Sequence, residues 1–371
     1  MEKELKLKTG RSGSITEIEL GIDFALKTRL PEILEERERK VAILTDSLVE
    51  KLLAPQIEHL DLKIFSFPAG EASKTRETKQ ILEDHLLSHN FGKDSLLITL
   101  GGGVVSDLGG FVAATYARGV PLIHIPTTLL GMVDAAIGGK TAVNTPYGKN
   151  MIGAFHPSEE VLIDGALLST LPEEEWTNGV VELLKAGLVA SPDLFHSLRD
   201  HHSQWKERDL PFIMEQIAQG VEIKKGIVEE DPLEEKGIRR ILNFGHTIGH
   251  ALEILEEYAL PHGRAVAMGM LVSCYVSEKM GLLAEETVAM IHETFDLYQI
   301  PLKLTKEHNL DEFIKILALD KKSLKASPRL VLLDEIGSVA PFEGEYCTEI
   351  EFSLLDEALS WMHNQFVKGD G

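Results

Sequence analysis

The sequence contains little cysteine, few basic residues relative to acidic ones, and no long apolar run. Its only two cysteines, Cys274 and Cys347, lie in unrelated contexts, which argues against a disulfide framework and a thiolate metal site. No window approaches ~18 uninterrupted apolar residues, and the segment MEKELKLKTG has no apolar core of signal-peptide length. A cytoplasmic protein that does not bind membranes is therefore expected.

The excess of acidic residues gives a formal net charge of −22. Because a field of this sign repels phosphate, neither nucleic acid nor an anionic membrane is expected as a partner. An anionic small-molecule substrate would need a local cluster of Lys and Arg. Since 371 residues exceed one ordinary hydrophobic core, two domains are expected.

The first half of the chain alternates short apolar runs with segments long enough for helices. The runs are VAILT (41–45), KIFSF (63–67), SLLITL (95–100) and PLIHI (121–125). Continuous apolar strands separated by helices predict a parallel, Rossmann-like α/β sheet whose ligands bind beyond the carboxyl ends of the strands. Beyond about Pro172 helical spacing dominates. We therefore predict an α/β domain over 1–174 and a mostly α-helical domain over 175–371.

A glycine-rich segment, TLGGGVVSDLGGF (99–111), follows one predicted strand and opens a predicted helix. Its three consecutive glycines allow the backbone to approach a ligand closely, and the N-terminus of the next helix offers N–H groups to a phosphate. The spacing is not that of G-x-G-x-x-G. A simple tight turn and a dinucleotide pyrophosphate site therefore both remain open.

The segment IPTTLLGMVDAAIGGKTAVNTPYGKNMIGAF (125–155) concentrates polar residues among small ones. Lys140 and Lys149 each stand beside a glycine, so little bulk separates their ammonium groups from a ligand. Exposed lysines are usually only solvated, but two such lysines in so apolar a segment favour ligand contact. With Arg118 they form the cationic cluster that an acidic protein needs for a phosphorylated or carboxylated substrate.

Three histidines are the strongest candidates for a metal centre. His246 and His250 lie four residues apart and so share a helix face. His262 follows in the segment LPHGRAVAMGM (260–270), where a turn of the chain can bring it back to them. Glu182, an acid in the apolar stretch GVVELLKAG, is the candidate carboxylate ligand. Histidine nitrogens with a carboxylate oxygen suit Zn²⁺, whereas simple packing is the alternative reading of each histidine alone. A histidine that is not a ligand could act as acid or base.

In their order along the chain, these segments resemble the 3-dehydroquinate synthase family of sugar-phosphate cyclases. The resemblance runs from FPAGEASK (67–74) to DKK (320–322). It includes GGGVVSD, YARG, the 125–155 segment, VVELLKAG, GIRRILNFGHTIGHALE and HGRAVAMGM. Each motif is modestly specific, and the ordered set is highly specific.

The resemblance implies that NAD binds the N-terminal domain and that a divalent metal, Zn²⁺ or Co²⁺, binds the C-terminal domain. The implied metal ligands are Glu182, His246 and His262. The implied nucleotide contacts are Ala69, Gly70, Glu71, Ala72, Ser73, Lys74, Gly103, Val104, Val105, Ser106, Asp107, Thr127, Thr128, Lys140, Lys149, Leu167, Leu168, Ser169 and Thr170.

The implied substrate is 3-deoxy-D-arabino-heptulosonate 7-phosphate, a phosphorylated sugar acid of the shikimate pathway to chorismate and the aromatic amino acids. Similar enzymes oxidise its C5 alcohol transiently with NAD⁺, eliminate phosphate, reduce the ketone again and close the ring by an intramolecular aldol step. His250 would be an acid/base, and Arg118 would reach the phosphate from the neighbouring subunit of a homodimer. The other implied substrate contacts are Asp134, Lys140, Asn150, Lys185, Lys224, Arg239, Asn243 and either Lys321 or Lys322.

Three other functions compete with this interpretation. A sibling sugar-phosphate cyclase would share the fold and cofactors, but siblings tend to alter IGGKTAVNTP and GKN, which are intact here. A metal- and NAD-dependent polyol dehydrogenase would release NADH and would have less use for the lysines. A degenerate sugar-phosphate-binding protein would have lost a ligand or a base, and none is lost. Three positions depart from the family pattern. Arg264 stands where Glu is usual, GVVELLKAG replaces the more common GMAEVIKYG, and EEDPLEEKG breaks a usually more acidic run. Arg264 is expected to add positive charge near the metal.

Overall fold

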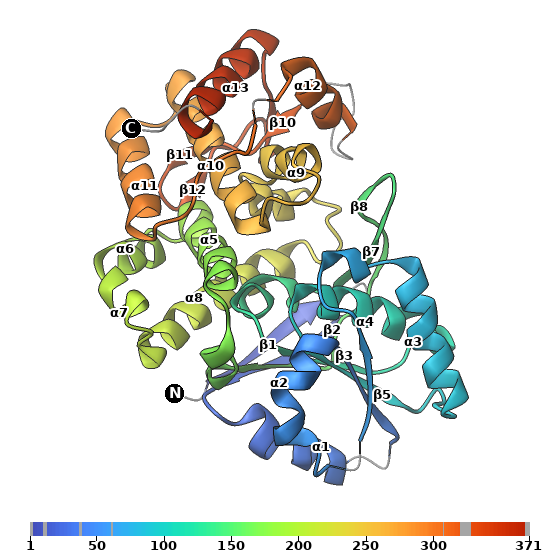
Figure 1. The fold of residues 1–371 in the computed structure, drawn as a ribbon. Helices are drawn as coiled ribbons and strands as arrows, with labels where there is room; N and C mark the ends of the chain where they lie inside the picture. The colour runs from blue at the N-terminus through green and yellow to red at the C-terminus, as the bar shows by residue number, and fades with distance from the viewer. Residues whose placement is uncertain are drawn as a thin grey trace. The chain divides into compact units, whose positions relative to one another are not determined.

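The computed structural model describes residues 3–9, 13–36, 39–60, 62–306, 308–319 and 328–367 (Figure 1). Contacts along the chain divide it into two units. The first unit holds residues 1–176 and 210–233, and the second holds 177–209 and 234–371. Each unit is described by itself below.

The first unit is built on a seven-stranded sheet with the order β1-β2-β9-β6-β5-β3-β4. The strands are β1 (Lys3–Thr9), β2 (Ser14–Gly21), β3 (Val41–Asp46), β4 (Lys63–Phe67), β5 (Leu96–Gly101), β6 (Leu122–Pro126) and β9 (Glu160–Asp164). Every neighbouring pair is parallel except β1 and β2, which form an antiparallel hairpin at one edge. The predicted parallel sheet is therefore confirmed, with the four predicted strands at β3, β4, β5 and β6.

Helices and one hairpin complete the first unit. The helical segments are η1 (Ala25–Arg29), α1 (Leu30–Glu36), α2 (Ser47–Ile57), η2 (Glu71–Ser73), α3 (Arg76–Ser88), α4 (Gly103–Thr115), η3 (Tyr116–Arg118), η4 (Gly131–Ala135), η5 (Gly165–Thr170) and α8 (Leu210–Glu230). The strands β7 (Lys140–Thr145) and β8 (Gly148–Phe155) pair with each other in a separate antiparallel sheet.

Local chemistry explains where these elements begin. Asp46 ends β3 and caps α2, because its carboxylate accepts from the backbone N–H groups of Leu48 and Val49. The strands β3 and β5 are buried along nearly their whole length. Their side chains pack against α3 and α4 in one apolar cluster that includes Leu44, Leu97 and Leu108. Burial of this cluster fixes the sheet, and with it the loops at the carboxyl ends of its strands.

The second unit is mostly helical, as predicted. It contains α5 (Glu173–Ala190) from Thr177 onward, α6 (Pro192–Asp200), α7 (His202–Lys206), η6 (Ile238–Asn243), α9 (His246–Leu255), α10 (His262–Lys279), α11 (Glu285–Leu297), α12 (Leu310–Leu319) and α13 (Phe352–Phe366). Two short antiparallel ladders pair β10 (Arg329–Leu330) with β13 (Thr348–Glu349) and β11 (Leu333–Glu335) with β12 (Ser338–Val339). Among the described residues, no helix is long and apolar enough to cross a bilayer.

Helices α9 and α10 cross at close range because glycines line their contact. A Cβ atom at Gly269 would lie 2.0 Å from the carbonyl oxygen of Gly245, and one at Gly249 would lie 3.0 Å from that of Ala265. No side chain fits in that space, so only glycine permits this approach. The two helices pass each other in opposite directions, with Gly245 against Gly269 and Gly249 against Ala265. The ring centroids of His246 and His262 lie 5.4 Å apart.

Candidate functional site

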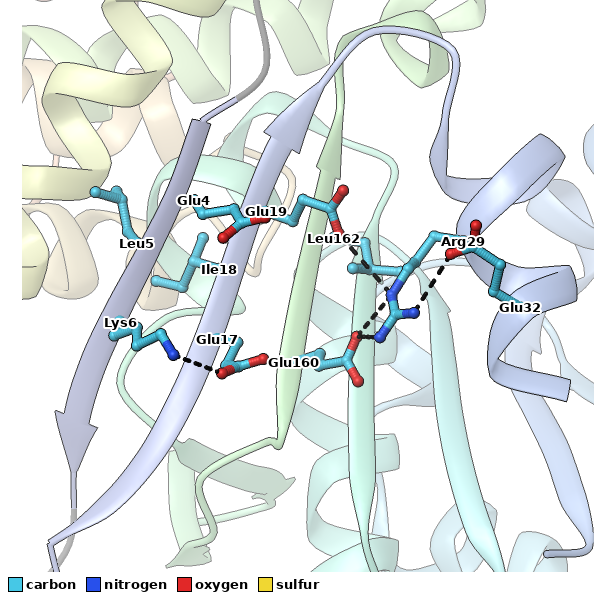
Figure 2. A pocket seen from close by; sticks show the side chains of 10 residues that line it. All are labelled: Glu4, Leu5, Lys6, Glu17, Ile18, Glu19, Arg29, Glu32, Glu160 and Leu162. Carbon is cyan, nitrogen blue, oxygen red and sulfur yellow. Dashed lines mark hydrogen bonds and ion pairs between the residues drawn. The ribbon is translucent and has the colours of Figure 1, made fainter. Parts of the chain in front are cut away.

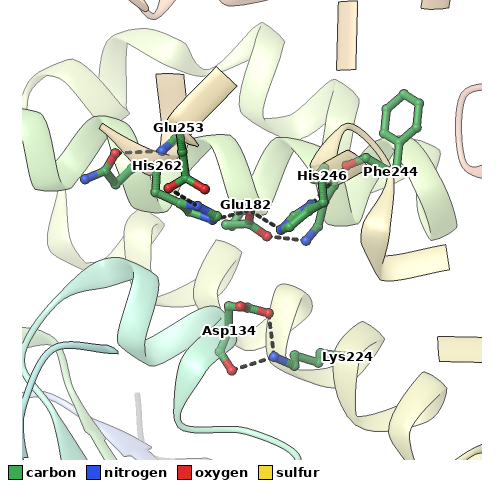
Figure 3. A network of polar contacts seen from close by, with 10 residues as sticks. Asp134, Glu182, Lys224, Phe244, His246, Glu253 and His262 are labelled. Carbon is green, nitrogen blue, oxygen red and sulfur yellow. Dashed lines mark hydrogen bonds and ion pairs between the residues drawn. The ribbon is translucent and has the colours of Figure 1, made fainter. Parts of the chain in front are cut away.

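The second unit brings the three predicted metal ligands together (Figure 3). Helix α5 contributes Glu182, α9 begins at His246 and α10 begins at His262. The Oε1 atom of Glu182 lies 3.6 Å from Nε2 of His246 and also 3.6 Å from Nε2 of His262. The carboxylate is only 3% exposed, so it is held among these partners rather than solvated.

The geometry of this cluster fits a divalent metal ion. One donor atom from each of Glu182, His246 and His262 lies within 4.8 Å of the other two. Two ligands bound tetrahedrally at about 2.0–2.1 Å from Zn²⁺ are about 3.4 Å apart, close to the observed oxygen–nitrogen distances. Two imidazole nitrogens and a carboxylate oxygen are also a donor set that Zn²⁺ and similar ions accept, with a position left for substrate.

Further contacts orient each donor. Nδ1 of His246 lies 3.2 Å from the carbonyl oxygen of Phe244, and Nδ1 of His262 lies 3.4 Å from Oε1 of Glu253. Partners of this kind keep the proton on Nδ1 and leave Nε2 for the metal. The ammonium of Lys185 contacts the other oxygen of Glu182, Oε2, so Oε1 is the oxygen that faces the histidines.

The first turn of α10 is fixed against α5. The backbone N–H of Gly263 donates to Oδ1 of Asn178 at 2.8 Å, and Asn178 lies one helical turn before Glu182. A Cβ atom at position 263 would lie 2.5 Å from the Cα of Asn178. The glycine that follows His262 is therefore required for the approach that places this histidine beside Glu182.

Electrostatics distinguish the two candidate histidine ligands. Burial, with the positive charge of Lys185, holds the pKa of His246 well below its usual value, so this ring is neutral. Burial would also lower the pKa of His262, but the carboxylates of Glu182 and Glu253 outweigh it and raise this pKa to about 10. A metal ion would thus replace a proton held on His262 between two carboxylates.

Glu253 is a residue of this cluster that the sequence analysis did not single out. It is 2% exposed, and with His250 and His262 it forms a second group whose donor atoms lie within 4.8 Å of one another. The signal was present in the sequence, because Glu253 follows His250 by three residues and His246 by seven, which places all three on one face of α9. An acid on that face is available to orient a histidine of the neighbouring helix.

The other predicted residues of the second unit lie around the same helices. The ring of His250 is half-buried, and its centroid lies 5.3 Å from that of His246. Arg239 is buried within η6, and Asn243 ends that segment. Lys321 and Lys322 lie outside the described residues.

Arg264 contacts the backbone of a neighbouring loop. Its Nε atom donates to the carbonyl oxygen of Pro301 at 2.7 Å, and its Nη2 atom donates to that of Lys303 at 3.0 Å. The guanidinium is therefore occupied by the backbone of the segment that follows α11. This departure from the family fastens a loop to the start of α10.

In the first unit, predicted nucleotide contacts lie at the carboxyl ends of β5 and β6. Gly102 caps α4, and the backbone N–H of Thr127 donates to the carbonyl oxygen of Gly101 at 3.0 Å. A Cβ atom on Gly102 would lie 2.9 Å from the Cγ2 atom of Thr128. The turn Gly103–Asp107 and the pair Thr127–Thr128 are therefore neighbours at the sheet edge where ligands of parallel sheets bind.

A buried lysine contacts two of the predicted residues. Nζ of Lys74, which is 4% exposed, donates to Oδ2 of Asp107 at 2.5 Å and to Oδ1 of Asn150 at 2.7 Å. Burial raises the pKa of Asp107 above its usual range, and the Lys74 ammonium partly offsets this effect. Lys149 approaches Glu71, with Nζ 3.8 Å from Oε1.

The remaining predicted residues of the first unit take separate positions. Nζ of Lys224 on α8 donates to both the backbone oxygen and Oδ1 of Asp134, at 2.5 Å each (Figure 3). Lys140 begins β7 with an exposed side chain. Arg118 is exposed and adopts a left-handed backbone, as does Ala117 before it. Of the Leu167–Thr170 stretch in η5, the two leucines are buried and Ser169 and Thr170 are exposed.

A cavity of about 260 Å³ lies elsewhere in the first unit, over β1, β2 and β9 (Figure 2). Five glutamates and only two basic residues, Lys6 and Arg29, contribute to its lining. Arg29 is already engaged by Glu19, Glu32 and Glu160. An acidic cavity whose arginine is committed to carboxylates repels a phosphorylated substrate, so it is not a candidate for the anion site.

Comparison with known proteins agrees with this geometry. The sequence profile described as 3-dehydroquinate synthase N-terminal matches residues 64–178, and the C-terminal profile matches residues 179–323. The chain is 39% identical over 319 residues to the 3-dehydroquinate synthase of Syntrophotalea carbinolica, which covers 84% of this chain and 88% of that protein.

Solved structures share the fold. A 2-epi-5-epi-valiolone synthase from Streptomyces hygroscopicus, determined with NAD⁺ and Zn²⁺ bound, has a TM-score of 0.84 and 26% identity, and covers 94% of this chain and 97% of its own. A 2-deoxy-scyllo-inosose synthase complexed with carbaglucose-6-phosphate, NAD⁺ and Co²⁺ has a TM-score of 0.81 at 24% identity, with 96% of this chain and 99% of its own covered. The two family profiles and the curated relatives confirm the resemblance seen in the sequence, and the chain belongs to the 3-dehydroquinate synthase family.

Proposed function

We propose that this chain is a 3-dehydroquinate synthase, an enzyme that converts 3-deoxy-D-arabino-heptulosonate 7-phosphate to 3-dehydroquinate and inorganic phosphate. The observation that carries the proposal is the convergence of Glu182, His246 and His262. The chain also matches both the N-terminal and the C-terminal profile of the family. Lys140 and Lys149, the two lysines of the 125–155 segment, support a phosphorylated, carboxylated substrate over a neutral polyol.

The metal would be held by Glu182, His246 and His262, and NAD by the segments at the carboxyl ends of the strands. NAD supplies reversible hydride transfer at C5 of the substrate, and the divalent ion supplies Lewis acidity at the hydroxyl being oxidised. His250, whose ring lies beside that of His246, is suited to move a proton of the substrate.

The chain's cationic side chains would bind and orient the substrate. Lys185 and Arg239 are buried. Because the dielectric constant is lower in the protein interior, a buried ammonium or guanidinium binds a carboxylate or phosphate more strongly than it does in water. Lys224, held by Asp134, is fixed in direction before substrate arrives. Fixed charges of this kind contribute mainly by positioning the two anionic ends of the substrate relative to the reacting carbon.

The same proposal assigns different ligands to the two domains and includes a homodimer. Residues 1–174 would bind NAD, and residues 175–371 would bind the metal and much of the substrate. Arg118 would reach the substrate phosphate of the other subunit in a cytoplasmic homodimer. Its exposed side chain on a left-handed backbone supports a role beyond local packing. Mixing Arg118→Ala protein with a His250→Ala variant should restore activity if sites use a partner's arginine, and should give none if they do not.

Release of inorganic phosphate from the heptulosonate phosphate tests the function. Purified protein with NAD⁺ and Zn²⁺ or Co²⁺ should release phosphate without accumulation of NADH, and a chelator should abolish the release. Incubation with a simple polyol and NAD⁺ is the matched control. Steady NADH formation there, with no phosphate released from the sugar acid, would replace the proposal with a polyol dehydrogenase.

A further inference from the structure

Asn144, on β7, holds three segments of the first unit together. Its backbone N–H donates to the carbonyl oxygen of Lys74 at 2.8 Å. Its side-chain Nδ2 donates to Oε1 of Glu71 at 2.7 Å, and its Oδ1 accepts from the backbone N–H of Asn150 at 3.0 Å. Both halves of the amide are therefore used, each by a different segment.

The residues around Asn144 close a ring of hydrogen bonds. Lys74 follows η2, which begins at Glu71, and its Nζ donates both to Asn150 and to Asp107 of α4. Asn150 adopts a left-handed backbone with φ of 55°, a conformation that surrounding contacts must stabilise. Its backbone is held by Asn144 and its amide oxygen by Lys74.

We propose that Asn144 is a positioning residue that couples the nucleotide segment to the substrate contact Asn150. The inference deepens the proposed function and rests on it, because Glu71, Lys74 and Asp107 are proposed to bind NAD and Asn150 the sugar acid. Since Oδ1 of Asn150 accepts from Nζ of Lys74, the orientation of the Asn150 amide is set by that lysine. A nucleotide that orders Glu71 and Lys74 thereby orders Asn150 as well.

This coupling has a thermodynamic consequence. If NAD orders the segment that Asn150 belongs to, NAD must strengthen binding of the sugar acid, and the sugar acid must strengthen binding of NAD by the same factor. A residue that only braced the β7–β8 hairpin would affect the thermal midpoint of unfolding and leave this factor unchanged. The two roles are therefore separable by experiment.

The decisive experiment reverses the polarity of one hydrogen bond. Asn144→Asp keeps an acceptor for Asn150 but sets a second carboxylate against Glu71. In the Glu71→Gln background, Gln can donate to that aspartate, so the contact is rebuilt. We expect Asn144→Asp to weaken NAD binding, measured by calorimetry, about tenfold in the native background and less than about threefold in the Glu71→Gln background. Equal losses in both backgrounds, or no loss in either, would overturn the proposal.

Matched measurements separate a positioning role from charge and from folding. Asn90→Asp adds the same charge at an exposed position remote from these contacts in the sequence, and it should leave NAD binding unchanged. Asn144→Ser removes the amide donor without adding charge, so it carries the test if the aspartate variant does not fold. For this variant we expect the KM for the sugar acid to rise about tenfold and the mutual strengthening by NAD to disappear. An unchanged KM with only a lower thermal midpoint of unfolding would mean that Asn144 merely stabilises the β7–β8 hairpin, and the proposal would be wrong.

NAD binding requires no turnover, so the inference and the proposed function can fail separately. If the protein binds NAD and the polarity reversal behaves as expected while no phosphate is released, the proposed function fails and the ring of contacts stands. If phosphate is released and Asn144→Asp binds NAD as the native protein does, the function stands and the coupling fails.

Discussion

The polar clusters of the two units differ in how their charges are balanced. In the first unit, a cation is surrounded by acceptors of the protein itself, since Lys74 contacts Asp107 and Asn150. In the second unit, Oε1 of Glu182 faces the Nε2 atoms of two histidines, and Lys185 contacts its other oxygen. In the first cluster the charge of the lysine is balanced by side chains of the protein. In the second cluster three atoms that can coordinate a metal ion lie together, and a bound cation would balance them.

The largest expected effect breaks the second cluster at one ligand. His246→Ala should lose the metal, with affinity reduced at least about a thousandfold, because only two of the three protein donors remain. Metal content after gel filtration, measured by atomic emission, is the readout. His250→Ala is the matched variant one turn along α9, and it should cripple turnover with the metal still bound. Equal metal content in the two variants would undo the distinction between ligand and acid/base.

The corresponding change in the first cluster removes its cation. Lys74→Met leaves Asp107 without its ammonium partner, and breaking a buried pair in this way costs about 3 kcal/mol of unfolding free energy. Urea denaturation should show this loss. Adding Asp107→Asn should recover most of the stability, because no unpaired carboxylate remains. If the double variant were no more stable than the single one, the pair would not be what stabilises this cluster.

A smaller effect is expected one contact away from the metal. Glu253→Gln keeps the shape of the side chain but weakens its hold on Nδ1 of His262, so metal affinity should fall about 10- to 100-fold. Competition with a coloured chelator measures the change. Glu257→Gln, at an exposed position just past α9, removes the same charge and should leave the affinity unaltered. Comparable losses in both would attribute the effect to net charge rather than to orientation.

The smallest effect concerns the residue that departs from the family. Arg264→Ala removes two hydrogen bonds to the carbonyl oxygens of Pro301 and Lys303 and should lower the unfolding free energy by about 1 kcal/mol. Metal affinity should stay within about twofold of the native value, since the guanidinium is committed to that loop. A large gain in metal affinity would instead show that its positive charge opposes the ion.

The fold could be predicted where apolar runs are continuous. The strands β3, β5 and β6 are buried on both faces, and their largely apolar runs indicated a parallel sheet. The edge strand β4 buries only Phe65 and Phe67. The hairpin of β1 and β2 was not predicted, although charged residues alternate with apolar ones in both strands, which is the pattern of a half-buried strand. Helix α8 shows helical spacing, but periodicity does not reveal which layer a helix packs against, and contacts place 210–233 with the sheet.

The candidate site was predictable to the extent that helix geometry determines it. An i, i+4 spacing places His246 and His250 on one face of α9, and a nearby His262 and Glu182 follow from residue chemistry. The supporting contacts were not predictable in the same way. Phe244 acts through its backbone oxygen, which no residue type reveals, and Asn144 acts through contacts with residues about 70 positions away.

The central claim is that Glu182, His246 and His262 hold a divalent cation. Anomalous diffraction from crystals of the native protein grown with Co²⁺ tests it most directly. We predict one anomalous peak at about 2.0–2.2 Å from Oε1 of Glu182 and from the two Nε2 atoms. A peak bound instead by His250, Glu253 and His262, or no peak near Glu182, would contradict it.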